Sequence, residues 1–151
     1  MTRFAERGGW WVVGQVVLLA GLVVALGWNA DWPWWIRAAG AALAVAGIAL
    51  LIAGSVALGR NLTPFPEPVS DAELVDTGVY GLSRHPIYGG VALLGIGVAL
   101  AAASPAALAV ALALTGFLTL KSAVEERHLV ATYPGYAAYR TRVRSRLIPW
   151  M

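Results

Sequence analysis

The sequence contains no cysteine, which excludes disulfide bonds, a thiol nucleophile and any metal site built from thiolates. It has two histidines, His85 and His128, and neither has a second ligand at a typical metal-binding spacing. A metal site is therefore not expected. Charged residues are also scarce, at 13% of the chain, compared with about 25% in ordinary soluble domains.

Apolar residues make up 59% of the chain and fall in long blocks rather than at amphipathic spacing. A membrane crossing takes roughly 20 such residues. With their interfacial flanks, the blocks predict four spanning helices near 10–29, 35–58, 86–103 and 105–124. The first block is too long for a signal-peptide core and lacks a small-residue cleavage site, so we expect it to be retained. The predicted fold is an all-α integral membrane protein with a single domain, 1–151.

The distribution of basic residues predicts the orientation. If both termini are cytoplasmic, every cation except Arg37 falls on the cytoplasmic side, as the positive-inside rule requires. Tryptophans gather at both ends of the predicted spans and leave their centres empty, which is typical of an aromatic belt. The arginine-rich tail is expected to contact anionic membrane lipids and not nucleic acid.

Small residues and loops indicate how the helices connect. Glycines recur every seven residues in the second span, which favours close helix packing within the molecule over a dimer interface. The recurring positions are Gly40, Gly47 and Gly54, with a second pair at Gly14 and Gly21. The third loop is very short. Ser104 at an N-cap and Pro105 at the first helical position predict a tight hairpin between the third and fourth spans.

The cytoplasmic segments are expected to be ordered. The loop over residues 59–84 starts with three prolines, which predicts a rigid lid or wall. We expect a short helical turn from Asp71 to Gly78. After the fourth span, four apolar residues at near-helical spacing predict an interfacial amphipathic helix that ends at Pro149. These residues are Tyr136, Tyr139, Val143 and Leu147.

Two polar clusters stand out in so apolar a chain. Arg84 and His85 begin the third span, and Glu125 and Glu126 end the fourth on the same side. Because the hairpin brings these helix ends together, the sequence predicts one juxtamembrane site that also includes Lys121. Taken singly, each residue also fits a topology signal, a solvated helix end or a helix start. Taken together, they favour a function.

The residues around these clusters follow a pattern. It consists of Leu74-Val75-x-x-Gly78-Val79-Tyr80, Arg84-His85-Pro86-x-Tyr88-x-Gly90, Glu125-Glu126-x-x-Leu129, Tyr136-x-x-Tyr139 and Ile148-Pro149. In this order and spacing, about 60–149, the chain resembles the integral-membrane methyltransferases typified by isoprenylcysteine carboxyl methyltransferase and the phospholipid N-methyltransferases. The first two spans match that group in hydropathy alone.

The resemblance implies a transfer of a methyl group from S-adenosylmethionine to a lipophilic acceptor. It places the cofactor among Ala72, Glu73, Leu74, Val75, Tyr80, His85, Pro86, Ile87, Tyr88 and Glu125. Arg84, Lys121 and Glu126 are the candidates for substrate contact and catalysis. Prenylcysteine enzymes of the group have an arginine, associated with the substrate carboxylate, where this chain has Lys121. Lysine keeps the charge but loses the bidentate fork.

Several functions remain open from the sequence alone. The acceptor atom can be the oxygen of an isoprenylcysteine-type carboxylate, a phospholipid amine or a small hydrophobic thiol. An amine or thiol requires a base, for which Glu126 is the nearest candidate. A transporter is disfavoured because the predicted spans carry no ionisable residue at mid-membrane. A non-catalytic scaffold or a related membrane reductase is a further alternative, and the sequence does not indicate an oligomeric state.

Overall fold

The structure is a computed structural model that describes residues 8–66 and 73–149. Within those ranges the chain is helical and contains no strand, so the all-helical class is confirmed. Five α-helices are α2 (Gly9–Ala25), α3 (Trp34–Leu58), α4 (Pro86–Ala101), α5 (Pro105–Thr132) and α6 (Tyr136–Arg142). Two short 3₁₀ helices are η1 (Gly59–Asn61) and η2 (Gly78–Gly81).

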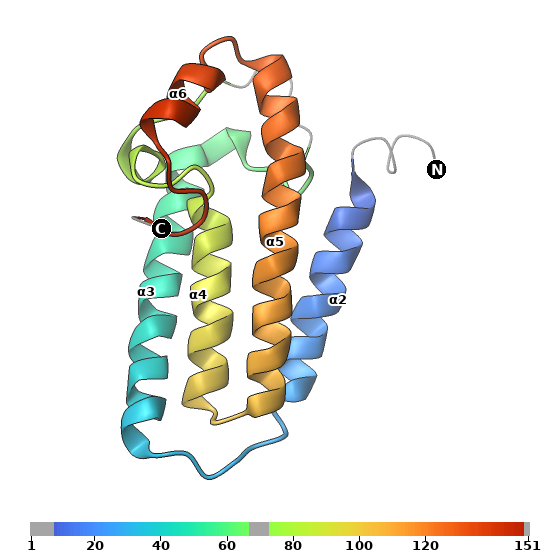
Figure 1. The fold of residues 1–151 in the computed structure, drawn as a ribbon, viewed down its shortest axis with the longest axis vertical. Helices are drawn as coiled ribbons and strands as arrows, with labels where there is room; N and C mark the ends of the chain where they lie inside the picture. Colours follow the sequence, from blue (N-terminus) through green and yellow to red (C-terminus); the bar gives the residue numbers. More distant parts are fainter. Residues whose placement is uncertain (1–7, 67–72, 150–151) are drawn as a thin grey trace.

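The four long helices run side by side, as Figure 1 shows. α4 packs between α3 and α5, and α2 packs on α5. The short connections 26–33 and 102–104 lie at one end of this bundle. Helix α6 and the long connection between α3 and α4 lie at the other end, where the last turns of α5 also project (Figure 1). The polar segments of the chain therefore gather at a single end.

Two helical stretches are long and apolar enough to cross a membrane. Trp34–Asn61 and Pro105–Thr132 each have 28 residues, with mean hydropathies of 2.4 and 1.8. Gly9–Ala25 and Pro86–Ala101 are apolar but shorter, at 17 and 16 residues. Many large apolar side chains on the bundle are exposed, which suits contact with lipid. Two stretches are therefore candidate membrane spans, and the four-span topology remains a prediction.

Helices α3 and α4 meet backbone to backbone along a seam of glycines. A Cβ atom on Gly47 would lie 2.5 Å from the backbone nitrogen of Leu94, and one on Gly40 would lie 2.5 Å from that of Ala101. Gly54 packs in the same way against the first turn of α4, at Ile87. The predicted packing within the molecule is therefore confirmed for these three positions. Such close approach is possible because glycine has no side chain to separate the helices.

A glycine also allows close packing between α2 and α5. A Cβ atom on Gly14 would lie 2.8 Å from the ring of Phe117, which also packs against Trp11 at a centroid distance of 5.2 Å.

Ser104 connects the ends of three helices. Its Oγ accepts a hydrogen bond from the Ala107 nitrogen (3.2 Å) and donates one to the Ala25 carbonyl (2.8 Å). This confirms the predicted hairpin between α4 and α5.

Two predicted boundaries were wrong. Helix α5 does not stop at residue 124 but continues to Thr132, so Glu125 and Glu126 lie inside a helix and not at its end. Gly78 does not end a helical turn either. The described residues before it, 73–76, are not helical, and Gly78 begins η2 with a positive φ of 60°. Asp71, the expected start of that turn, lies outside the described residues.

The predicted C-terminal helix is present but shorter than expected, and its apolar side is buried. Helix α6 ends at Arg142, and residues 143–149, which we term the C-terminal strap, are not helical. Tyr136, Tyr139 and Val143 are buried together, in contact with Leu74 and Leu129. The apolar side chains of this segment therefore pack on the protein's own core and not on a membrane surface.

The glycine seam can be tested with a matched pair of substitutions. Gly47→Ala places a methyl group against the backbone of α4, and we expect it to lower the stability by about 1–3 kcal/mol. Gly116→Ala is the control, because a Cβ at this helical position meets nothing within 4 Å. The thermal midpoint of each variant in detergent, followed by tryptophan fluorescence, makes the comparison. Equal shifts for the two variants would contradict the packing.

Candidate functional site

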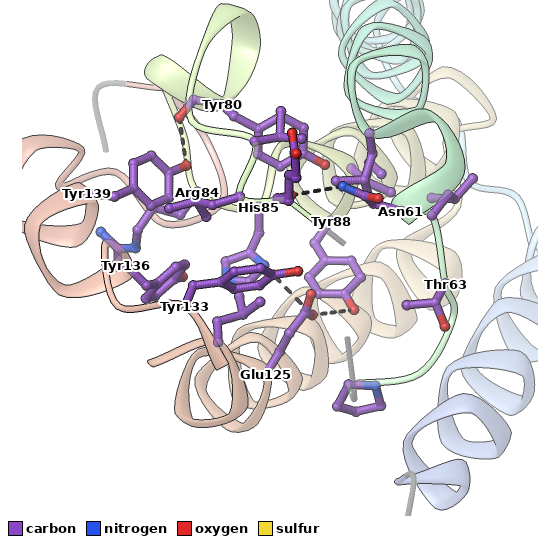
Figure 2. Close-up of a pocket in the computed structure, with 18 of the residues that line it drawn as sticks. Asn61, Thr63, Tyr80, Arg84, His85, Tyr88, Glu125, Tyr133, Tyr136 and Tyr139 are labelled. Carbon is purple, nitrogen blue, oxygen red and sulfur yellow. Dashed lines mark hydrogen bonds and ion pairs between the residues drawn. The ribbon is translucent and has the colours of Figure 1, made fainter. Parts of the chain in front are cut away.

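A pocket lies at the polar end of the bundle, between the long connection, the first turn of α4, the upper part of α5 and helix α6 (Figure 2). Its lining combines charged, aromatic and aliphatic side chains. The lining residues are Leu58, Asn61, Leu62, Thr63, Phe65, Pro66, Glu73, Leu74, Val75, Tyr80, Arg84, His85, Ile87, Tyr88, Glu125, Leu129, Tyr133, Tyr136 and Tyr139.

The wall next to α3 comes from residues 61–66, which we term the proline segment. Asn61 donates a hydrogen bond from Nδ2 to the carbonyl of Glu73 (2.9 Å) and so holds the two described arms of the long connection together. Thr63 Oγ1 accepts a hydrogen bond from the Phe65 nitrogen (3.2 Å) and fixes the turn that precedes Pro66. The expectation of an ordered wall is met in these residues.

Glu125 is the centre of the opposite wall. Its Oε2 atom accepts a hydrogen bond from the Tyr88 hydroxyl (2.9 Å) and lies 3.8 Å from His85 Nδ1. The rings of His85 and Tyr88 are stacked, with centroids 5.6 Å apart and an interplanar angle of 4°. Figure 2 shows the three side chains side by side on the pocket wall. The juxtaposition of the start of α4 with the upper part of α5 is therefore present.

A buried ion pair lies behind this wall. Arg84 Nε donates to Glu126 Oε1 at 2.9 Å, and the two side chains are only 7% and 5% exposed. Arg84 Nη1 donates to the carbonyls of Val143 (2.6 Å) and Arg144 (2.8 Å) in the C-terminal strap. The planar guanidinium suits such simultaneous contacts, because its N–H groups point in fixed directions.

The strap also pairs with the backbone next to Arg84. The Arg84 nitrogen donates to Ser145 O (3.0 Å), and the His85 nitrogen donates to Arg146 O (2.8 Å). Ser83 Oγ donates to the same Arg146 carbonyl at 2.9 Å. The strap therefore holds Ser83, Arg84 and His85 through hydrogen bonds, and His85 lines the pocket from this position.

Four tyrosines form the aromatic side of the pocket. Burial raises the pKa of Tyr80, Tyr136 and Tyr139 above the usual range of a phenol, so these hydroxyls stay protonated and are able to donate. Tyr139 uses its hydroxyl to bond the Tyr80 carbonyl at 2.7 Å. The rings of Tyr136 and Tyr139 meet edge to face at 5.5 Å, and Tyr133 completes the wall.

Two buried polar atoms of lining residues have no hydrogen-bond partner among the described residues. They are the hydroxyl of Tyr136 and Nε2 of His85, which lies 3.4 Å from Glu126 Oε1 without a hydrogen bond. A buried polar group without a partner is costly, and in native structures it commonly marks a position that a ligand or water satisfies. The hydroxyl of the lining residue Tyr136 therefore points to a ligand, whereas His85 Nε2 faces the carboxylate of Glu126 behind the wall.

Nine of the residues predicted for the site line this pocket. They are Glu73, Leu74, Val75, Tyr80, Arg84, His85, Ile87, Tyr88 and Glu125. Pro86, Lys121 and Glu126 are buried outside the lining, and Ala72 lies outside the described residues. Lys121 contacts Gln15 and Pro64 behind the ring of Tyr88.

The remaining lining residues were not among those predicted for the site. The proline segment was expected to form a wall, but no residue in it was singled out. Tyr136, Tyr139 and Leu129 were part of the pattern that carries the resemblance. The burial of Tyr136 and Tyr139 was not anticipated, because their spacing with Val143 and Leu147 was interpreted as a membrane-facing stripe.

Comparison with known proteins identifies the family. The model of the phospholipid methyltransferase family matches residues 35–135. The chain belongs to this family. The match includes α3, α4, α5 and the long connection, and it excludes α2, α6 and the C-terminal strap. No curated protein matches the chain. Membership in the phospholipid methyltransferase family indicates a methyltransferase activity in a membrane setting, and it implies a lipid substrate.

Within the described residues, no group of three or more histidine and acidic side chains is placed to hold a metal ion. The pocket lining offers two carboxylates, a guanidinium, an imidazole and several phenols. Such a set is suited to binding and orienting a polar molecule that carries a positive charge.

The buried ion pair behind the pocket can be compared with an exposed one. Arg84→Gln leaves Glu126 without its closest cation, and we expect a loss of stability of about 3–5 kcal/mol. Arg142→Gln removes the ion pair with Asp76, in which the arginine side chain is 59% exposed. Its expected cost is below about 1 kcal/mol. Thermal midpoints in detergent measure both, and a similar small loss for the two variants would contradict the role of Arg84.

Proposed function

We propose that this protein transfers a methyl group from S-adenosylmethionine to a lipophilic acceptor at the cytoplasmic face of a membrane. The observation that carries the proposal is the pocket around Glu125, whose lining residues, except Tyr136 and Tyr139, lie within the segment that matches the phospholipid methyltransferase family. The apolar helices next to the pocket place it where a lipid and a water-soluble cofactor can meet.

The residues present fit the cofactor. Its ammonium group is matched by the carboxylate of Glu125, which Tyr88 and His85 already orient. Glu73 adds a second carboxylate to the lining. The aromatic wall offers ring faces for a sulfonium or an adenine. The hydroxyl of Tyr136, which has no hydrogen-bond partner among the described residues, provides a hydrogen-bonding position for one of its remaining polar groups.

When bound, S-adenosylmethionine supplies a methyl carbon on a sulfonium, and the carbon–sulfur bond breaks with its electron pair leaving on sulfur as the acceptor atom bonds to carbon. The protein's contribution is to position and to exclude water. Holding two reactants in the correct geometry supplies a large part of such a rate enhancement. Arg84 and Glu126 contribute indirectly, because their ion pair holds the backbone that presents His85.

The acceptor is proposed to enter from the lipid next to α3. The pocket is aliphatic on this side, at Leu58, Leu62 and Ile87, and Leu62 is half exposed. An isoprenylcysteine-type carboxylate would need a cation, and Lys121 is already bound to Gln15 and Pro64. A phospholipid amine, the alternative acceptor, needs no such cation. An amine would have to lose a proton to a base, and Glu73 is the lining carboxylate that is not assigned to the cofactor.

The proposed topology keeps four spans and a single domain over residues 1–151, with both termini cytoplasmic. The apolar character of α2 and α4 supports the two shorter spans, and tilting or local bilayer thinning accommodates short helices. The same topology places the pocket on the side that carries most of the basic residues.

Cofactor binding is the decisive measurement. We expect calorimetric titration of the detergent-solubilised protein with S-adenosylmethionine to give micromolar affinity, and Glu125→Gln to weaken it by about tenfold or more. Asp31→Asn is the control, since Asp31 is exposed in the connection before α3, at the opposite end of the bundle. A folded wild-type protein that does not bind, with or without lipid, would exclude the methyltransferase proposal and favour a scaffold.

Substitutions of two tyrosines distinguish a hydroxyl that contacts the ligand from one that supports the fold. Tyr136→Phe removes a hydroxyl without a partner among the described residues, so we expect unchanged or higher stability but weaker binding of S-adenosylmethionine. Tyr139→Phe removes the hydrogen bond to Tyr80 and is expected to cost about 1 kcal/mol of stability. Thermal midpoints and titrations of both variants test this. Normal affinity in Tyr136→Phe would exclude its hydroxyl as a ligand contact.

A further inference from the structure

Lys121 is a buried cation whose contacts come from three different parts of the fold. The residue as a whole is only 1% exposed. Nζ donates to Gln15 Oε1 at 2.6 Å and to the Pro64 carbonyl at 3.0 Å, and it lies 5.2 Å from the centroid of the Tyr88 ring. α2, the proline segment and α4 therefore converge on one ammonium group of α5.

These contacts use the whole bonding capacity of the ammonium. A lysine side chain has three donor hydrogens and no acceptor. Two oxygens and one aromatic face match that number, so the charge is compensated away from water. Removing any one partner would leave the buried ammonium incompletely bonded, which lowers the stability of the fold. The three partners are thus energetically coupled through Lys121.

Gln15 is the unusual member of this group. It is the one polar side chain in the apolar block 12–26, and it comes from a helix outside the segment that matches the family. An apolar residue at this position would suit a lipid-facing or packed helix equally well. The amide is therefore best explained by its hydrogen bond to Lys121.

Pro64 links this contact to the pocket. It lies between Thr63 and Phe65, which both line the pocket, and its carbonyl is the atom held by Lys121. Gly8, the N-cap of α2, lies close to the same segment, because a Cβ atom there would lie 3.0 Å from the ring of Pro66. The hydrogen bonds of Lys121 to Gln15 and Pro64 join this wall to α2.

We infer that Gln15 is a positioning residue that, through Lys121, holds the proline segment against the pocket. Lys121 in this arrangement fastens the wall and does not contact the substrate. The effect on cofactor affinity rests on the proposed function, whereas the effect on the order of the proline segment does not.

Amide hydrogen exchange tests the inference without any cofactor. Gln15→Met keeps the length of the side chain and removes the acceptor, and we expect exchange in a peptide covering residues 59–66 to accelerate by about tenfold. Gln15→Glu keeps an acceptor for Lys121 and is expected to restore the wild-type rate. Thr119→Val is the matched control, because the Thr119 hydroxyl bonds only the Thr115 carbonyl of its own helix among the hydrogen bonds found.

A double-mutant cycle shows whether Gln15 acts through Lys121. We expect Gln15→Met to add nothing to the exchange rate in a Lys121→Met background, because coupled residues are not additive. If Lys121→Met or the double variant fails to fold, the exchange rates of Gln15→Leu, Gln15→Met and Gln15→Glu are compared instead. Unchanged exchange in folded Gln15→Met, or additive effects in the cycle, would overturn the inference.

Titration with S-adenosylmethionine provides the second readout. We expect Gln15→Met to bind about tenfold more weakly and Gln15→Glu to bind as the wild type does. A wild-type protein that does not bind would refute the proposed function, and the exchange experiment would still decide the role of Gln15. Accelerated exchange together with unchanged affinity would refute its role in positioning the pocket.

Discussion

The ion pair between Arg84 and Glu126 is the constraint on which the polar end of the molecule depends. Two charges removed from water are stable only when their remaining hydrogen-bonding positions are filled. Here the filling groups are carbonyls of the C-terminal strap. The start of α4, the upper part of α5 and the strap must therefore assemble together, and the wall that carries His85 and Glu125 forms as part of that assembly.

The parts of the fold that were predictable have local causes. Helix α3 was expected over 35–58 and is found at Trp34–Leu58, because an apolar block bounded by Pro33 and Gly59 defines its own ends. Pro86 and Pro105 similarly begin α4 and α5. The meeting of the two polar clusters followed from the hairpin at Ser104, which needs only a serine followed by a proline.

The parts that were not predictable depend on partners distant in sequence. Lys121 bonds residues 106 and 57 positions away, and no local pattern indicates which oxygen a buried lysine will find. Tyr136, Tyr139 and Val143 show the same spacing whether they face lipid or a protein core. The α5 boundary was misjudged because charged residues after 120 resemble the end of a span, although a helix can leave the apolar layer without ending.

The glycine seam between α3 and α4 has a mechanical consequence. Where backbone rests on backbone, there are no side-chain rotamers that can rearrange to let two helices slide or separate. The pair is expected to move as one rigid body. Under the proposed function, a lipid acceptor that enters the pocket must then displace something outside this pair, and the side-chain contacts outside it include those that join α2 and the proline segment to the rest of the bundle.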